Sequence, residues 1–160
     1  MENKSKRVIG FTELKEKYLH HRYPLLMIDR VTDYQENEYI EAIKCVTGNS
    51  PELIGHYPTE RSIMPGTHVI QAFSQLAIIF FKISNGPLKA DELTLVTSMK
   101  AKFLKPIFPG DTIHILLKPK RMTAEIGMFI CEAKVEDQIV VRGSLTLVKT
   151  SVSNFVGAPW

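Results

Sequence analysis

The sequence predicts an α+β domain in which an antiparallel sheet curls around one buried helix. Segment 67–84 is apolar on almost every side, which is typical of a helix enclosed by other elements. After it, apolar and more polar residues alternate, as in half-buried antiparallel strands. The chain has 160 residues, of which 44% are hydrophobic, enough to bury one core. We therefore expect a single domain over 1–160, with loose ends at 1–10 and 150–160.

Before the central helix, the sequence predicts one short helix and two strands. A helix is expected over 11–19, with Thr12 as its cap. Strands are expected over 25–33 and 39–47, where apolar and β-branched residues are enriched on either side of a polar turn. Segment 48–66 holds three prolines and three glycines, so it should be a loop with room for one short helical turn.

The helix over 67–84 should be roughly 27 Å long at 1.5 Å per residue. The sequence Asn85-Gly86-Pro87 then ends it, because glycine and proline favour helix termination. The alternating pattern that follows predicts four strands, over 95–103, 113–117, 129–135 and 139–147. Turn signals lie between them, at 106–111, at Pro119 and at 137–138.

Composition excludes several classes of function. A net charge of +3 is too small and scattered to indicate nucleic acid as the partner. The longest apolar run has six residues, 76–81, whereas a membrane span needs about 20. Cys45 and Cys131 lie far apart, which fits a reducing cytoplasm rather than a disulfide framework. The histidines lack metal-binding spacings, and no nucleotide-phosphate or serine-nucleophile motif is present, so no metal site is assigned.

His56 stands out among the five histidines because of its position in the loop before the central helix. Imidazole has a reference pKa near 6.5, so it can act as a base at neutral pH. Gly66 lies at the expected start of the helix, where a backbone N–H can bind a ligand oxygen. A base and an oxyanion donor would then lie ten residues apart. The alternative interpretation is a structural turn before a core helix.

Four polar residues of the central helix share one stripe. At 100° per residue, His68, Gln71, Gln75 and Lys82 lie within about 60° of one another. The stripe is either the solvent-facing edge of the helix or the lining of a polar cavity beside His56. Proximity to Gly66 favours the cavity for His68 and Gln71 only.

The motifs resemble those of one enzyme family. The chain reads LHHRYPLLMIDRV at 19–31, GHYP at 55–58, IMPG at 63–66 and FLKPIFPGD at 103–111. In order and spacing these resemble the 3-hydroxyacyl-acyl carrier protein dehydratases of fatty-acid synthesis, over roughly residues 14–149. The resemblance implies a hot-dog fold, a long central helix wrapped by an antiparallel sheet. It also implies a homodimer with active sites shared between subunits, often assembled into a trimer of dimers.

The same resemblance implies roles for individual residues. His56 matches the catalytic base, and Gly66 matches the glycine whose N–H binds the thioester carbonyl. Gln71 stands where the family has a catalytic glutamate supplied by the partner subunit, and Gln75 matches a glutamine of the family. A neutral amide cannot protonate the leaving hydroxyl, and losing general-acid help typically costs about 10²–10⁴-fold in rate.

Other departures from the family lie close to the same place. The family has a glycine and then an arginine-proline pair where this chain reads TERS at 59–62. His68 occupies a site that is usually aliphatic. Clustered changes favour a natural divergent paralogue over an engineered Glu→Gln substitution, although one sequence leaves both open.

The resemblance also implies an acyl carrier protein as partner. Lys100, Lys102 and Lys105 would form a basic rim that steers this acidic protein, or they are simply solvated lysines at a strand end. No bound cofactor is expected, because the phosphopantetheine arm arrives as part of the substrate.

Three functions remain in competition. The first is 3-hydroxyacyl-thioester dehydration. The second is enoyl-thioester isomerisation, which expels no hydroxyl and so tolerates Gln71 better. The third is a non-catalytic role as the carrier-binding partner of an active paralogue, in a heterodimer that combines His56 with the paralogue's glutamate.

Overall fold

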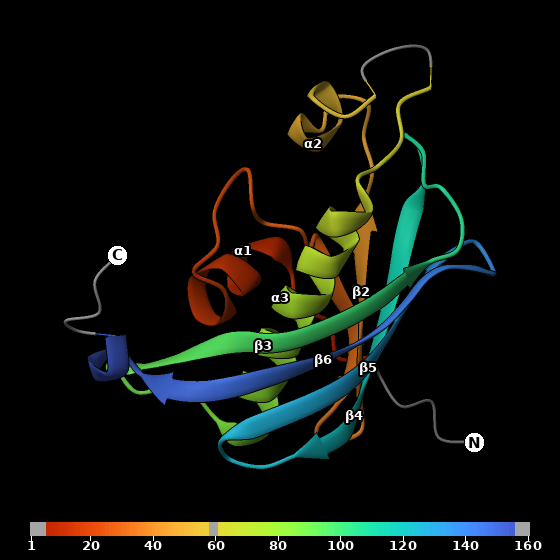
Figure 1. The fold of residues 1–160 in the computed structure, drawn as a ribbon. Coiled ribbons are helices and arrows are strands. Elements are labelled where there is room, and N and C mark those ends of the chain that lie inside the picture. The colour runs from red at the N-terminus through yellow and green to blue at the C-terminus, as the bar shows by residue number, and fades with distance from the viewer. Residues whose placement is uncertain (1–5, 58–60, 156–160) are drawn as a thin grey trace.

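An antiparallel sheet wraps around one long helix in the computed structural model, which describes residues 6–57 and 61–155 (Figure 1). The sheet has six strands in the order β1-β2-β4-β5-β6-β3. The strands are β1 Arg30–Gln35, β2 Tyr39–Cys45, β3 Glu92–Phe103, β4 Thr112–Met122, β5 Ile126–Val135 and β6 Gln138–Ser151. All neighbouring strands pair antiparallel, as the alternating pattern predicted.

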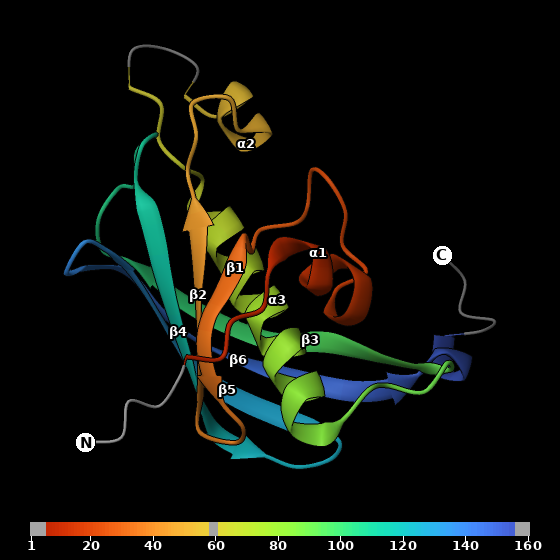
Figure 2. The same ribbon diagram turned by 180° about the vertical axis from the view of Figure 1, so that it is seen from behind.

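The central helix, α3, spans Gly66–Asn85 and lies in the hollow of the curled sheet (Figure 2). It confirms the prediction of 67–84 to within one residue at each end. Gly86 ends the helix with a φ of 85°, which glycine adopts without a steric penalty. The buried side chains of α3 form the middle of the core: Val69, Ala72, Phe73, Gln75, Leu76, Ala77, Ile79, Phe80 and Phe81.

By length and composition alone, α3 could also cross a membrane. Half of its most apolar window is buried inside the structure. Since the core helix of a water-soluble protein has the same composition, the position of α3 inside the sheet accounts for its apolar character.

The N-terminal region differs from its prediction in two ways. Helix α1 covers only Phe11–Glu13 and continues as a π-helical turn, η1, over Leu14–Tyr18. Gly10, not Thr12, occupies the N-cap position. Residues 1–10 are not uniformly loose, because Ile9 is buried and pairs with Val31 of β1.

The predicted strand over 25–33 is wrong in its first half. Strand β1 begins at Arg30, although Met27 and Ile28 are fully buried. The backbone N–H of Met27 donates to the Gln75 side chain of α3 instead of to a neighbouring strand. Apolar residues at this position therefore pack against the helix without forming a ladder.

The turn predicted at Pro119 is also wrong. Pro119 lies inside β4 opposite Phe129, at a register shift between Pro119 and Arg121. A bulge tolerates a residue without an N–H, so the strand continues to Met122. At the other end, β6 reaches Ser151 and is followed by the short helix η2, Val152–Phe155, so residues 150–155 are not loose.

Candidate active site

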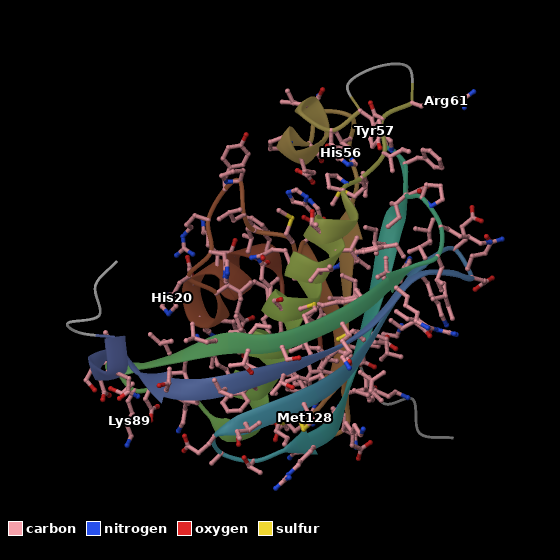
Figure 3. The ribbon with its side chains drawn as sticks, viewed as in Figure 1. His20, His56, Tyr57, Arg61, Lys89 and Met128 are labelled. Atoms are coloured by element: carbon pink, nitrogen blue, oxygen red, sulfur yellow. The ribbon has the colours of Figure 1, made fainter. Side chains whose placement is uncertain are left out.

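His56 lies between the short helix α2, Pro51–Ile54, and the first turn of α3 (Figure 3). Its Nδ1 atom lies 2.8 Å from the carbonyl oxygen of Ile63. A carbonyl can only accept, so Nδ1 carries the hydrogen and Nε2 of the neutral ring keeps its lone pair. This hydrogen bond therefore leaves His56 with the form of imidazole that a general base requires.

Tyr57 holds the other side of the His56 ring. The two ring centroids are 4.7 Å apart, and the ring planes are nearly perpendicular, at 83°. Tyr57 has a φ of 48°, a left-handed conformation that is rare for an aromatic residue. The sharp turn at Tyr57 redirects the chain directly after His56, so the imidazole is fixed by its own loop.

The imidazole lines a pocket of about 420 Å³. The walls are mostly apolar and come from the loop before α3, the first turn of α3, the segment after β3, and β6. The lining residues are His56, Ile63, Met64, Gly66, Thr67, Phe103, Leu104, Lys105, Pro106, Ile107 and Val141. A pocket of this size and character accommodates a small apolar ligand.

Gly66 brings a backbone donor to the same pocket. It is the first residue of α3, where backbone N–H groups have no partner within the helix. A Cβ atom built on Gly66 would lie 2.5 Å from Cε1 of Phe103. The missing side chain thus lets the Phe103 ring pack against the helix start. His56 and Gly66, which the sequence singled out separately, face one cavity.

His68 and Gln71 do not line this pocket within one chain. The Nδ1 atom of His68 is buried and has no hydrogen-bond partner in the part of the chain that the structure describes. Gln71 is half-buried, and among residues 6–57 and 61–155 its side chain has no hydrogen bond. The expected cavity lined by both His56 and these residues is therefore not formed by a single chain.

The other two residues of the stripe have structural contacts. Gln75 is fully buried; its Oε1 accepts from the Met27 N–H at 2.8 Å, and its Nε2 donates to the Leu25 carbonyl at 2.5 Å. Lys82 donates from Nζ to the Tyr18 carbonyl at 2.8 Å. The stripe is not a solvent-facing edge at these positions; it fastens the N-terminal segment to α3.

The three predicted rim lysines are divided between two surfaces. Lys105 lines the pocket and hydrogen-bonds to Gln138. Lys100 and Lys102 line a separate depression of about 300 Å³ beside Arg142. Their position in β3 turns both side chains away from the core, so they do not surround the mouth of the pocket.

Sequence reasoning missed the parts of the site that act through backbone or shape. Ile63 lies in the IMPG motif and Phe103 in the FLKPIFPGD motif. These motifs could have pointed to both residues, but sequence reasoning assigned no function to the Ile63 carbonyl or to the Phe103 ring. Among the residues that the structure describes, no group of three His, Cys, Asp or Glu side chains lies close enough to hold a metal ion.

Comparisons with known proteins identify the family. Residues 19–144 match the FabA-like domain. The chain is 38% identical over 157 residues to coronafacic acid dehydratase of Pseudomonas savastanoi pv. glycinea, covering 98% of this chain and 94% of that protein. It is 37% identical over 139 residues to the 3-hydroxyacyl-acyl-carrier-protein dehydratase FabZ of Rickettsia rickettsii (strain Sheila Smith), covering 87% and 94%.

Solved structures share the fold. The dehydratase heterocomplex ApeI:P from Xenorhabdus doucetiae aligns with a TM-score of 0.73 at 15% identity, over 88% of this chain and 93% of that one. A hot-dog-like protein from Thermanaerovibrio acidaminovorans aligns with a TM-score of 0.60 at 15% identity, over 77% and 88%. The predicted hot-dog fold is thus confirmed, and the chain belongs to the FabA-like family of 3-hydroxyacyl-acyl-carrier-protein dehydratases.

Proposed function

We propose that this member of the family dehydrates 3-hydroxyacyl-acyl carrier protein to the trans-2-enoyl form, in fatty-acid or related lipid or polyketide synthesis. The observation that carries the proposal is the convergence of His56 and Gly66 on one apolar pocket. The dehydratase relatives, at 37–38% identity, support the reaction type.

The geometry assigns a step to each group. Nε2 of His56 removes the proton from C2 of the substrate, and the Gly66 N–H stabilises the negative charge that develops on the thioester oxygen. The C3–O bond then breaks, a double bond forms between C2 and C3, and the hydroxyl leaves as water after receiving a proton. The apolar walls exclude bulk water and strengthen both interactions.

The proton for the leaving hydroxyl needs a donor other than an amide. In a composite site the partner subunit's Gln71 would hold the hydroxyl by a hydrogen bond without giving up a proton. His68 is one turn earlier on the same helix, and its buried Nδ1 atom has no hydrogen-bond partner among the described residues. An imidazolium at this position is the substitute acid that the chain itself offers.

We expect a homodimer, and the exposed edge of the sheet supports this expectation. Strand β3 is the last in the strand order, and Leu95 and Val96 on it are more than one-third exposed. The outer edge of this twelve-residue strand has no partner strand among the described residues, and such an edge is a template for pairing with a second strand. We expect the dimers to form a trimer of dimers in the cytoplasm.

We expect the substrate to be carried by acyl carrier protein, which is the carrier named for the FabZ relative. Its phosphopantetheine arm would deliver the acyl group, so no bound cofactor is required. Lys105, at the pocket, is the residue best placed to meet an acidic carrier, because Lys100 and Lys102 lie on another surface.

Two alternatives rest on specific observations. Gln71 favours isomerisation of an enoyl thioester, in which His56 moves a proton from C4 to C2 and no hydroxyl leaves. The structural neighbour described as a dehydratase heterocomplex favours a second arrangement, in which this chain pairs with an active paralogue. NMR analysis of enoyl-thioester products tests the first, and mass spectrometry of the complex purified from the native organism tests the second.

The direct test is a turnover assay with 3-hydroxyacyl chains of several lengths on acyl carrier protein. We expect the enoyl product, and we expect His56→Ala to abolish it. His114→Ala is the matched control, because His114 is exposed on β4 and does not line the pocket. Full activity of His56→Ala would show that the base is assigned wrongly.

A further inference from the structure

A second pocket, of about 490 Å³, is lined by the start of α2 and by segments of the N-terminal region. Helix α2 and the segment 19–29 stand next to each other in both ribbon views (Figures 1 and 2). The lining residues are Phe11, Lys15, Arg22, Tyr23, Pro24, Leu26, Asp29, Lys44, Ser50, Pro51 and Glu52. None of them lines the pocket of His56. The proposed dehydration uses no part of this cavity.

A nearly buried ion pair forms one wall of the second pocket. The Lys44 and Glu52 side chains are only 12% and 4% exposed, and Lys44 Nζ lies 3.6 Å from Glu52 Oε1. That distance is too long for a hydrogen bond. Oε1 is buried and has no hydrogen-bond partner among the described residues. The carboxylate is neutralised by Lys44, yet it still lacks a donor.

An unsatisfied buried acceptor is costly, and native structures rarely leave one without a partner. Asp29, the other carboxylate of the pocket, already accepts from the Cys45 N–H at 2.6 Å. The Glu52 carboxylate therefore keeps acceptor capacity that an N–H or O–H group of a molecule in the cavity can use.

Two further cations line the cavity. Lys15 and Arg22 form no ion pair within residues 6–57 and 61–155. Arg22 donates from one guanidinium nitrogen to the carbonyls of Leu19 and His21, at 2.9 and 2.8 Å, which anchors its head group. With Lys44 and Glu52 compensating each other, Lys15 and Arg22 stand against the single carboxylate of Asp29, and this surplus of one positive charge favours an anionic group in the ligand.

We propose that this cavity binds a small organic anion that also carries an amide N–H or a hydroxyl group. The donor of the ligand meets Glu52, its anionic group meets Lys15 and Arg22, and its apolar body packs on Phe11 and Leu26. The volume lies within the range of small-molecule sites, about 300–1,000 Å³. The proposal is independent of the dehydratase assignment, since the two pockets share no lining residue.

N-acetyl-L-leucine is a suitable probe, because it combines a carboxylate, an amide N–H and an apolar side chain. Binding to the full-length protein is followed by ¹H–¹⁵N NMR. We expect saturable shifts at Phe11, Leu26 and Glu52, and an affinity at least about 10-fold higher than for two analogues. These are 4-methylpentanoate, which lacks the N–H, and N-acetyl-leucinamide, which lacks the charge. The factor follows from one hydrogen bond to a charged group.

Two variants separate this site from others. In Lys44→Met/Glu52→Leu the ion pair is replaced by apolar side chains of similar volume, so the fold should persist. It should lose at least about 10-fold in affinity for the probe, as should Lys15→Ala. The variant His56→Ala should bind the probe as the wild type does. Absence of saturable binding, equal affinity for the three probes, or unchanged binding by Lys44→Met/Glu52→Leu would overturn the proposal.

Discussion

The two halves of the polar stripe on α3 are used differently. Gln75 and Lys82, in the second half, hydrogen-bond to backbone groups of the segment 18–27. The side chains of His68 and Gln71, in the first half, make no hydrogen bond or ion pair with another described residue, although the Nδ1 atom of His68 is buried. We call Gln75 and Lys82 the committed half of the stripe, because their side chains hydrogen-bond within the protein. We call His68 and Gln71 the uncommitted half.

This difference separates structural from functional polarity on a buried helix. A buried polar group is retained for folding when it satisfies another buried polar group, as Gln75 does for Met27 and Leu25. A polar group without such a partner has its hydrogen-bonding capacity left for a ligand or a second subunit. Only the uncommitted half lies in the first turns of α3, which begins at Gly66 beside the pocket of His56.

The largest effect is expected from the uncommitted half. If the missing acid limits catalysis, Gln71→Glu should raise the rate of dehydration by up to about 10²–10⁴-fold. The substitution keeps the side-chain length, and apolar neighbours should raise the pKa of the new carboxyl, which favours the protonated acid. Under the same condition, His68→Leu should leave the rate within a few-fold. Single-turnover dehydration of a 3-hydroxyacyl-carrier substrate measures both.

The reverse result has a clear meaning. If His68 already serves as the acid, His68→Leu will abolish activity and Gln71→Glu will gain little. If neither substitution changes the rate, neither residue takes part in dehydration. The difference between the two halves of the stripe would then have no bearing on catalysis.

The committed half should govern stability instead. Gln75→Leu leaves the buried N–H of Met27 and the part-buried carbonyl of Leu25 without their partner, which should cost about 2–4 kcal/mol in the free energy of unfolding. Gln71→Leu is the matched control, the same substitution one turn earlier, and should change stability by no more than about 1 kcal/mol. Urea unfolding measures both. Equal losses would remove the distinction between the two glutamines.

Lys82 should have a smaller effect. Burial lowers the pKa of Lys82, because its charge is poorly solvated beside a single carbonyl acceptor. Lys82→Met removes the hydrogen bond to Tyr18 but also the desolvation of a cation. We expect the two effects to offset each other, to within about 1 kcal/mol of unfolding free energy. A loss as large as that of Gln75→Leu would show that the carbonyl of Tyr18 depends on this lysine.

The sequence predicted the fold well because periodicity reports directly on burial. Helix α3 and the later strands follow from which residues must face the core. The start of strand β1 did not, since the backbone N–H of Met27 donates to the Gln75 side chain instead of to a neighbouring strand, a contact between residues 48 positions apart. Pro119 misled the prediction because a bulge can tolerate a proline within a strand.

The candidate site was predictable only in part, for similar reasons. Motif spacing identified His56 and Gly66, and both line one pocket. The Ile63 carbonyl that sets the tautomer of His56 is a backbone group, which no residue pattern reveals. Spacing also grouped Lys105 with Lys100 and Lys102. Strand β3 ends at Phe103, however, so Lys105 lies in the segment after the strand and lines the pocket of His56, whereas Lys100 and Lys102 lie on the strand and line another surface.

The smallest predicted effect is on the pH dependence of stability, through His21, which lies near Lys82 of the committed half. Burial, helped by the positive charges of His20 and Lys82, lowers the pKa of His21 below its ordinary value of 6.5. The folded protein therefore favours neutral His21, while the unfolded chain binds a proton more readily. The stability contributed by neutral His21 should be fully present above about pH 6.5 and should decline as the pH falls from there through the pKa of the folded state.

His21→Leu should show a shallower decline of stability between pH 7.5 and 5 in thermal unfolding. His114→Leu, at an exposed site, should keep the wild-type slope. Lys82→Met should also flatten the decline, because it removes one of the charges that oppose protonation of His21. A steeper slope for Lys82→Met would contradict an electrostatic link between the two residues.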